Sequence, residues 1–135
     1  MPLRREAPVA ERLRATLSPS RPLKAYQLTQ ILGEQMQRRS YANTVYRVMA
    51  ALVASGEAVP LASVKAWLRA APGERAPVIL LCRECQCAVQ VEGDEVAQRL
   101  HRICDKNAFV PARTYAEVVG LCGECRDGKA GPAAP

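Results

Sequence analysis

The chain has few aromatic residues and no long apolar run. Aromatics make up only 4% of its 135 residues, so Leu, Val and Ala must build most of the core. No apolar stretch approaches the ~18 residues that a membrane-spanning helix needs. At the N-terminus, Arg4, Arg5 and Glu6 precede no apolar run of the length found in a secretory signal peptide. These absences predict a cytoplasmic protein with no membrane partner.

The chain also lacks the residue combinations that most enzymes use. His101 is the only histidine, so the sequence offers no Ser/His/Asp or Cys/His arrangement that would activate a nucleophile. It contains no glycine-rich loop of the kind that cradles phosphates. We therefore expect no catalytic residues and no small-molecule substrate, and a binding function is favoured.

Cysteine is the residue type that carries the most information. Cys82 and Cys85 form one Cys-x2-Cys pair and Cys122 and Cys125 form a second, with 36 residues between the pairs. Four thiolates satisfy tetrahedral Zn²⁺ completely and leave no open position, so such a site is structural. Two disulfides or a redox dithiol would use the same spacing, but a reducing cytoplasm disfavours disulfides. We predict one structural zinc ion per chain, bound by these four cysteines.

Two further cysteines lie outside the pairs. Cys104 falls on the apolar face of a predicted helix, where we expect a small core residue. Cys87 follows Cys85 by two residues and is therefore close to the predicted zinc site. Oxidation of Cys87, or its exchange as a zinc ligand, is a second hypothesis for this residue.

Positive charge is concentrated in the first half of the chain. Residues 1–70 carry eleven Lys and Arg against four Glu, a net charge of +7, whereas residues 71–135 carry eight against nine acidic residues, a net charge of −1. The boundary at Ala71-Pro72-Gly73 suits a hinge. A basic half suggests polyanion binding, although an ordinary solvated surface would have the same composition. Two domains and a disordered tail are predicted, at residues 1–71, 75–126 and 127–135.

Helical periodicity dominates the first domain, where three apolar stripes each predict a helix. The expected helices are the segment before Ser18-Pro19-Ser20, the segment from Pro22 to near Gly33 with Leu23 in its stripe, and the segment from about Ser40 to a cap at Gly56. Residues 58–61 and 64–68 are expected to pair as a hairpin. Three helices followed by a hairpin is the winged-helix arrangement, in which the third helix enters the DNA major groove.

Strands and one helix are expected in the second domain. The predicted helix opens at Gly93-Asp94-Glu95 and ends at Asn107, and the predicted strands are 78–81, 88–91 and 114–121. A strand–strand–helix–strand unit closed by zinc leaves a sheet face or edge uncovered, which symmetric dimerisation would bury. The fold class is therefore α+β, with an N-terminal winged helix-turn-helix domain and a small α/β dimerisation domain that holds a structural four-cysteine zinc.

Four stretches of the chain carry a family resemblance, namely LKAYQLTQIL, NTVYRVMAALVASGEAV, LLCRECQCAVQV and EVVGLCGECR. In this order and spacing, over roughly residues 8–126, they resemble the ferric uptake regulator family, and most of all its zinc uptake regulator branch. The resemblance implies a homodimeric transcription regulator, a repressor, that binds a pseudo-palindromic site in double-stranded DNA. The first helix that many family members carry before the winged helix is missing from this sequence.

The resemblance also implies roles for individual residues. Arg47 matches a base-reading arginine, and a guanidinium can pair bidentately with guanine. Tyr26 matches a tyrosine that reaches a base from the preceding helix, and Tyr46 matches one placed near the DNA backbone and thymine methyls. Core packing is the alternative role for Tyr46. Phosphate contacts are expected from residues at the start of the third helix and from nearby cations, namely Ser40, Asn43, Thr44, Lys24, Arg38 and Arg39.

The chain departs from the family at the positions of the sensory metal site. By spacing, Val59 and Ala70 stand where the family has a histidine and a cysteine, and Val119 stands where a histidine often precedes the closing motif. Glu74-Arg75-Ala76-Pro77 replaces a histidine-rich segment. Because His101 alone cannot form a second site, we expect a regulator that lacks most of the sensory metal ligands.

Two classes of function are consistent with this pattern. The basic half and the matching residues Tyr26, Tyr46 and Arg47 favour a sequence-specific DNA-binding regulator. The missing sensory ligands would also suit a degenerate family member that acts by protein contact, or a thiol-based redox sensor that uses Cys87.

Overall fold

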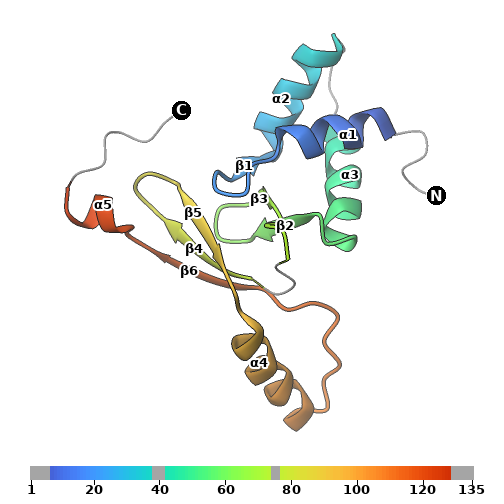
Figure 1. Ribbon diagram of the computed structural model, residues 1–135. Coiled ribbons are helices and arrows are strands. Elements are labelled where there is room, and N and C mark those ends of the chain that lie inside the picture. The colour runs from blue at the N-terminus through green and yellow to red at the C-terminus, as the bar shows by residue number, and fades with distance from the viewer. Residues whose placement is uncertain (1–6, 38–41, 74–76, 129–135) are drawn as a thin grey trace. The chain divides into compact units, whose positions relative to one another are not determined.

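The structure, a computed structural model, describes residues 7–37, 42–73 and 77–128 and combines helices with two small sheets (Figure 1). The chain divides into two compact units, Met1–Ala70 and Ala71–Pro135. The mixed helix and sheet architecture predicted from the sequence is confirmed. No helix among the described residues is long and apolar enough to cross a membrane.

Three helices surround the core of the first unit. They are α1 (Ala7–Thr16), α2 (Ala25–Met36) and α3 (Ala42–Ala54). Each helix turns one apolar stripe inward, so that Leu13, Leu28 and Val48 meet in a buried cluster. Burying one such side chain contributes about 1.5–3 kcal/mol relative to leaving it in water. Within the described residues this core contains no fully buried aromatic side chain, as the composition predicts.

A three-stranded antiparallel sheet completes the first unit. Its strands β1 (Leu23–Lys24), β2 (Ala58–Leu61) and β3 (Ala66–Arg69) lie in the order β1-β3-β2. The hairpin between β2 and β3 is confirmed, with Ala58 opposite Arg69 and Leu61 opposite Ala66. Gly56 has a φ of 80° directly after α3, and its N–H donates to the Val53 carbonyl at 3.1 Å. The predicted glycine cap therefore ends α3 and turns the chain into the hairpin.

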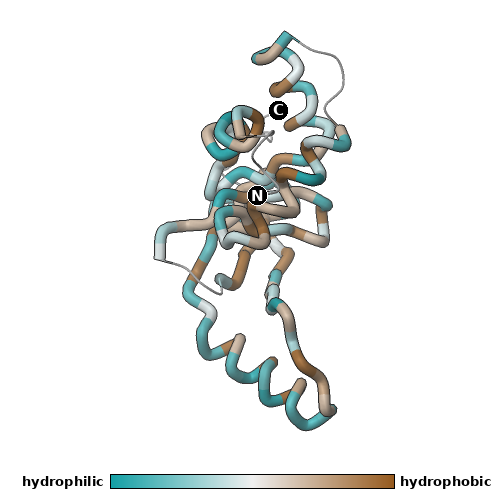
Figure 2. The backbone as a smooth tube through the Cα atoms, turned by 90° about the vertical axis from the view of Figure 1, so that its right-hand side faces the viewer, coloured by the Kyte–Doolittle hydropathy of each residue, from teal (hydrophilic) through white to brown (hydrophobic). Residues whose placement is uncertain are grey.

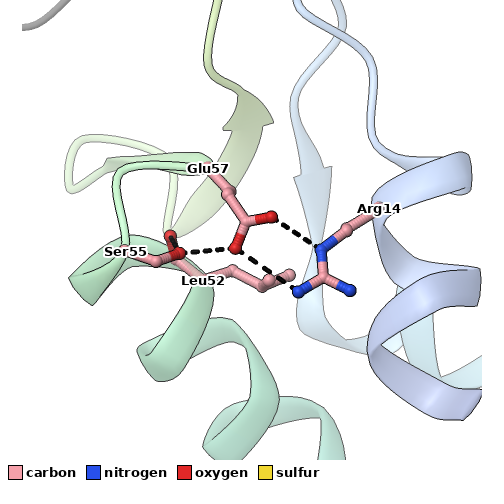
Figure 3. Close-up of polar contacts among 4 residues, drawn as sticks. All are labelled: Arg14, Leu52, Ser55 and Glu57. Atoms are coloured by element: carbon pink, nitrogen blue, oxygen red, sulfur yellow. Dashed lines mark hydrogen bonds and ion pairs between the residues drawn. The ribbon is translucent and has the colours of Figure 1, made fainter. Parts of the chain in front are cut away.

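A polar contact ties α1 to the start of this hairpin (Figure 3). Arg14 donates to both carboxylate oxygens of Glu57, from Nε at 2.7 Å and from a terminal nitrogen at 3.4 Å. The Ser55 hydroxyl lies 2.5 Å from the second of these oxygens. The hydrogen bond from Arg14, followed by that from Ser55, lowers the pKa of Glu57 below its usual value of 4.5. The carboxylate thus holds helix and hairpin together as long as it is ionised.

The second unit contains a three-stranded sheet, and the middle strand of this sheet comes first of the three in the sequence. Strand β4 (Val78–Cys82) pairs antiparallel with β5 (Ala88–Val91) and parallel with β6 (Ala116–Gly120). The parallel pair requires a crossover, which α4 (Asp94–Lys106) provides. A final short helix, α5 (Gly123–Arg126), follows β6. The C-terminal ends of β4 and β6 consequently lie side by side.

Helix α4 has an apolar face that nothing in its own unit covers. None of its residues is buried, although Val96, Leu100 and Ile103 recur at helical spacing. Ile103 is 56% exposed, and Phe109 and Val110 beyond the helix are exposed as well. Figure 1 shows α4 beyond the end of the sheet, and Figure 2 shows apolar residues recurring along this otherwise hydrophilic helix. A face of this kind is normally covered by a partner.

Several expectations about single elements are corrected by the structure. Leu23 belongs to β1, opposite Trp67, and not to the second helix. That helix does not stop near Gly33 but continues to Met36, because Leu32 and Met36 still pack on the core. Gln37 ends it in the left-handed conformation, with a φ of 53°. The last strand is shorter than predicted, at Ala116–Gly120, and α5 was not predicted.

Two further expectations concern the ends of elements and a cysteine. Cys104 is only half-buried, on a helix with no buried residue, so it is not a core residue as expected. The apolar pattern of α4 was correct, but the described residues of its unit bury none of it. The predicted start of the third helix at Ser40 and most of the predicted tail, residues 129–135, lie outside the described residues.

The Arg14–Glu57 pair predicts a pH-dependent stability of the first unit. A lowered folded-state pKa means that the stabilisation is complete above the unfolded-state value near 4.5 and is lost as the pH falls through the lowered value. Glu57→Gln should reduce the free energy of unfolding at pH 7 by up to about 1 kcal/mol, since both side chains are 42% exposed. Urea unfolding followed by the fluorescence of Trp67, the only tryptophan, measures this.

The control is Glu11→Gln, which removes an exposed carboxylate from α1. The difference between wild type and Glu57→Gln should shrink below pH 4.5, while Glu11→Gln should change little at either pH. A difference that stays constant with pH would contradict the role of the ionised carboxylate.

Candidate metal centre and nucleic-acid interface

The four paired cysteines meet at one end of the second sheet. Cys82 is the last residue of β4, and its register partner is Gly120, the last residue of β6. Because these strands are parallel, both ends point the same way and carry their cysteine pairs to the same place. The sulfur atoms of Cys82, Cys85, Cys122 and Cys125 all lie within 4.8 Å of one another. Two segments 36 residues apart thus form a single cluster.

Backbone hydrogen bonds shape both cysteine turns. The Gln86 N–H donates to the Cys82 carbonyl at 3.0 Å, and the Arg83 N–H donates to the Gly120 carbonyl at 2.9 Å. In the second turn the Cys125 N–H points at the Cys122 sulfur, 3.4 Å away. The left-handed residue is Gln86 in the first turn, with a φ of 65°, and Gly123 in the second turn does not have a positive φ. A Cβ on Gly123 would meet no atom within 4 Å, so no close approach requires glycine there.

The size and chemistry of this cluster fit zinc. Zn–S bonds of ~2.3 Å in a tetrahedron place the sulfurs about 3.8 Å apart. The sulfurs of Cys85 and Cys122 are 3.9 Å apart. Among the residues that the structure describes, this is the only group of three or more His, Cys, Asp or Glu close enough to hold a metal ion. The predicted structural zinc site is confirmed in its residues and its geometry.

The protonation of the four thiols shows why the cluster needs a cation. The backbone N–H groups of Cys122 and Cys85 lower the pKa of Cys82 to about 6. Burial and hydrogen bonds with the other cysteines, Cys122 first, raise the pKa of Cys125 above its usual value of 9.0. The Cys82 thiolate therefore forms readily, whereas the Cys125 thiolate is disfavoured. A divalent cation in the cluster would favour both thiolates through its positive charge.

Cys87 lies beside this centre but outside the cluster. Its carbonyl accepts the Cys82 N–H at 2.9 Å, and its half-buried side chain lines an apolar pocket of about 410 Å³. Cys82 and Cys122 line the same pocket, with Leu80 and Val118 among its other walls. His101 is exposed on α4, where its Nε2 lies 3.2 Å from the Thr114 hydroxyl.

The positions expected for a sensory metal site carry no ligand atoms in their side chains. Val59 is buried in β2, Ala70 is half-buried after β3, and Val119 is half-exposed in β6. Pro77 is half-buried, and residues 74–76 lie outside the described part of the chain.

The residues predicted to contact DNA lie on the solvent side of the first unit. Helix α3 buries Val45, Val48 and Leu52 and turns the opposite face outward. Asn43, Tyr46 and Arg47 share the outward face at a spacing of three and four residues, and Thr44 is half-buried beside them. Arg47 donates to the Thr44 hydroxyl at 3.4 Å. Ser40, where the third helix was predicted to start, and the cations Arg38 and Arg39 lie outside the described residues.

The two other predicted contacts come from the start of α2. Tyr26 is 67% exposed in its first turn, and Lys24 is exposed at its N-cap. The Lys24 N–H donates to the Gln27 side chain at 2.8 Å, which fixes the chain where β1 becomes α2. The side chains of Tyr26 and Lys24 are therefore both open to solvent.

Tyr46 is not a core residue. It is 57% exposed, which excludes the core-packing alternative, and its ring meets the ring of Trp67 edge to face. Trp67 was not predicted to have a functional role. Its place in the predicted hairpin strand 64–68 was the indication that the sequence offered.

Known proteins of similar structure were found, although no family model and no curated protein matches the sequence. XcZur in its holo form is 27% identical, with a TM-score of 0.73 over 89% of this chain and 85% of that chain. A zinc uptake regulator in complex with zinc and DNA is 21% identical, with a TM-score of 0.76 over 93% and 83%. The ferric uptake regulator Fur of Helicobacter pylori is 14% identical, with a TM-score of 0.57 over 92% and 86%. The predicted resemblance to the ferric uptake regulator family and its zinc uptake regulators is confirmed.

The cysteine cluster predicts one tightly bound zinc ion per chain. Cys122→Ser removes one thiolate and one link between the two halves of the site, so the variant should lose most of its zinc. A loss of ~2 kcal/mol would lower the Tm by roughly 8–16 °C for a domain of this size. Metal analysis and thermal unfolding of freshly reduced protein measure both effects.

Cys104→Ser is the matched control, because Cys104 lies outside the cluster and should keep the zinc content of the wild type. Zinc should also dissociate as the pH falls, because protons compete for the thiolates. Full zinc content and Tm in Cys122→Ser would show that the cluster is not the site.

Proposed function

We propose that this protein is a DNA-binding transcription regulator, a repressor. Residues 1–71 form its winged-helix DNA-binding unit, and residues 75–126 form its dimerisation unit. The observation that carries the proposal is the outward face of α3, where Asn43, Tyr46 and Arg47 stand exposed on a helix whose other face is locked into the core. Side chains of this kind on a rigid helix can enter the major groove without disturbing the fold. The structural match to a zinc uptake regulator complexed with zinc and DNA supports the same use of this scaffold.

Within this proposal the exposed residues have different tasks. Arg47 reads a base, because a guanidinium can form two hydrogen bonds with the O6 and N7 atoms of guanine. Tyr26 and Tyr46 add contacts to bases or thymine methyls. Asn43 and Thr44 bind phosphate near the start of α3. Lys24 provides attraction that does not depend on sequence, together with Arg38, Arg39 and Ser40, which lie outside the described residues.

The second unit is proposed to form a homodimer. Among its described residues, 77–128, only four apolar residues are buried, Ile79, Leu81, Cys82 and Ala88, so this part of the unit has a small core. Its exposed apolar residues lie on α4, after it, and on the sheet, where Val89 and Val118 are more than half exposed. A two-fold dimer would bury these surfaces against each other and present two α3 helices to a pseudo-palindromic operator.

The alternative functions use the same structure differently. A family member acting by protein contact would need only the second unit, and a thiol-based sensor would need Cys87 beside the zinc cluster. The exposed α3 face favours DNA binding over both.

Since the side chains of Val59, Ala70 and Val119 offer no ligand atoms, specific DNA affinity should change less than tenfold when zinc is added to protein whose four-cysteine site is already full.

Binding to DNA should depend on Arg47 and Lys24 in different ways. Arg47→Ala should weaken binding to a duplex selected by the protein from a random pool by about 1–3 kcal/mol, because a base contact is lost. Its affinity for a shuffled duplex should hardly change. Lys24→Ala should weaken binding to both duplexes alike and reduce the salt dependence by about one phosphate contact. Fluorescence anisotropy at several salt concentrations measures both constants.

Lys24→Ala serves as the matched control for loss of one positive charge. If Arg47→Ala weakened binding to both duplexes equally, α3 would not read sequence. Failure of the wild type to bind any duplex would refute the proposed function itself.

Dimerisation should depend on the exposed face of α4. Ile103→Glu places a charge on this face and should convert the dimer to monomer at micromolar concentration, as measured by light scattering. Gln98→Glu changes an exposed residue half a turn away from Val96 and should leave the dimer intact. A wild-type protein that is monomeric with its zinc bound would contradict the proposal.

A further inference from the structure

The ring contact between Tyr46 and Trp67 links the outward face of α3 to the hairpin. The ring centroids are 6.0 Å apart and the ring planes are inclined by 69°, which is edge-to-face geometry. Pairs of this kind contribute about 0.5–1.5 kcal/mol beyond the area that they bury. Trp67 is the only tryptophan in the chain, so the fluorescence of the protein reports on the surroundings of this one ring, Tyr46 among them.

The two rings are held very differently. Trp67 is half-buried and packs against the core of the first unit. It lies in the middle strand β3, with Leu23 of β1 and Pro60 of β2 as its register partners. Tyr46, in contrast, is 57% exposed and lies one turn from Asn43 and next to Arg47. Trp67 is thus held in place by the core, and it restrains one side of the solvent-exposed Tyr46 ring.

Restraint of an exposed ring has a direct consequence for binding. A long side chain that becomes immobile in a complex costs roughly 0.5–1.5 kcal/mol in lost rotamer freedom. A tyrosine already held against Trp67 has lost part of that freedom before DNA arrives. The contact therefore favours complexes in which Tyr46 keeps its orientation, and only a duplex that fits this orientation gains from it.

We propose that Trp67 is a positioning residue for DNA recognition, which holds Tyr46 in the orientation that the operator requires. The inference rests on the proposed function, because it assigns the source of discrimination at the same interface. Trp67 carries no charge, so its loss should reduce the preference for the operator and leave the salt dependence unchanged. Trp67→Phe keeps an aromatic edge or face for Tyr46, whereas Trp67→Leu keeps only an apolar side chain.

The contact itself is tested in the protein without DNA. Tyr46→Leu should shift the emission maximum or intensity of Trp67, because it removes the ring next to the indole. Tyr26→Leu removes an exposed tyrosine from α2 and should leave the emission unchanged. Equal emission in wild type and Tyr46→Leu would overturn the proposal at its first step.

The positioning role is tested by the ratio of two affinities, for the duplex selected by the wild type and for a shuffled duplex of equal length. Trp67→Leu should lower this ratio about 3- to 10-fold, and Trp67→Phe should retain most of it. Val53→Ala also removes packing from the edge of the same core and is the control for general destabilisation. A misfolded fraction weakens binding to both duplexes alike, so it leaves the ratio unchanged.

The outcomes separate the inference from the proposed function. If the wild type shows no preference for any duplex, the proposed function fails and the inference fails with it. If the wild type shows a preference that Trp67→Leu retains in full, only the positioning role is refuted. A ratio lowered equally by Trp67→Leu and Val53→Ala would make Trp67 an ordinary packing residue and would also refute it.

Discussion

Four cysteine sulfur atoms lie within 4.8 Å of one another, a spacing that suits one cation between them, and the second unit is organised around this cluster. The parallel pairing of β4 and β6 brings Cys82 level with Gly120, and each strand then delivers one cysteine turn. Few apolar residues of the unit are buried, so its own core supplies limited stability. Zinc at one end and, in the proposed dimer, a second chain on the exposed apolar faces would both stabilise so small a unit.

The first unit combines a rigid core with exposed side chains on α3, among them Tyr46 and Arg47. Its aliphatic core fixes α3 through Val45, Val48 and Leu52. The Arg14–Glu57 contact ties α1 to the point where α3 passes into the hairpin. Rigid support from behind allows Tyr46 and Arg47 to remain exposed without becoming disordered. Under the proposed function, side chains held in this way would lose little conformational entropy when DNA is bound.

Much of this arrangement could be predicted because the information is local. The apolar stripe of α3, the cap at Gly56 and the two cysteine spacings each occupy fewer than twenty adjacent residues. Predictions failed where distant residues decided the outcome. Leu23 is a strand residue because Trp67 lies opposite it, and α2 continues past Gly33 because Met36 still reaches the core. Cys104 has the pattern of a core residue, but no residue of its helix α4 is buried.

The sequence by itself determined which residues could bind zinc, which helix faces are apolar and which half of the chain is basic, because residue type and spacing decide these properties. Only the tertiary structure decided that 36 intervening residues fold so that the cysteine pairs meet, since a parallel strand pair forms through long-range hydrogen bonds. The contact of Trp67 with Tyr46 was decided in the same way. These two residues are 21 positions apart, and the α3–hairpin turn, not any local pattern, brings their rings together.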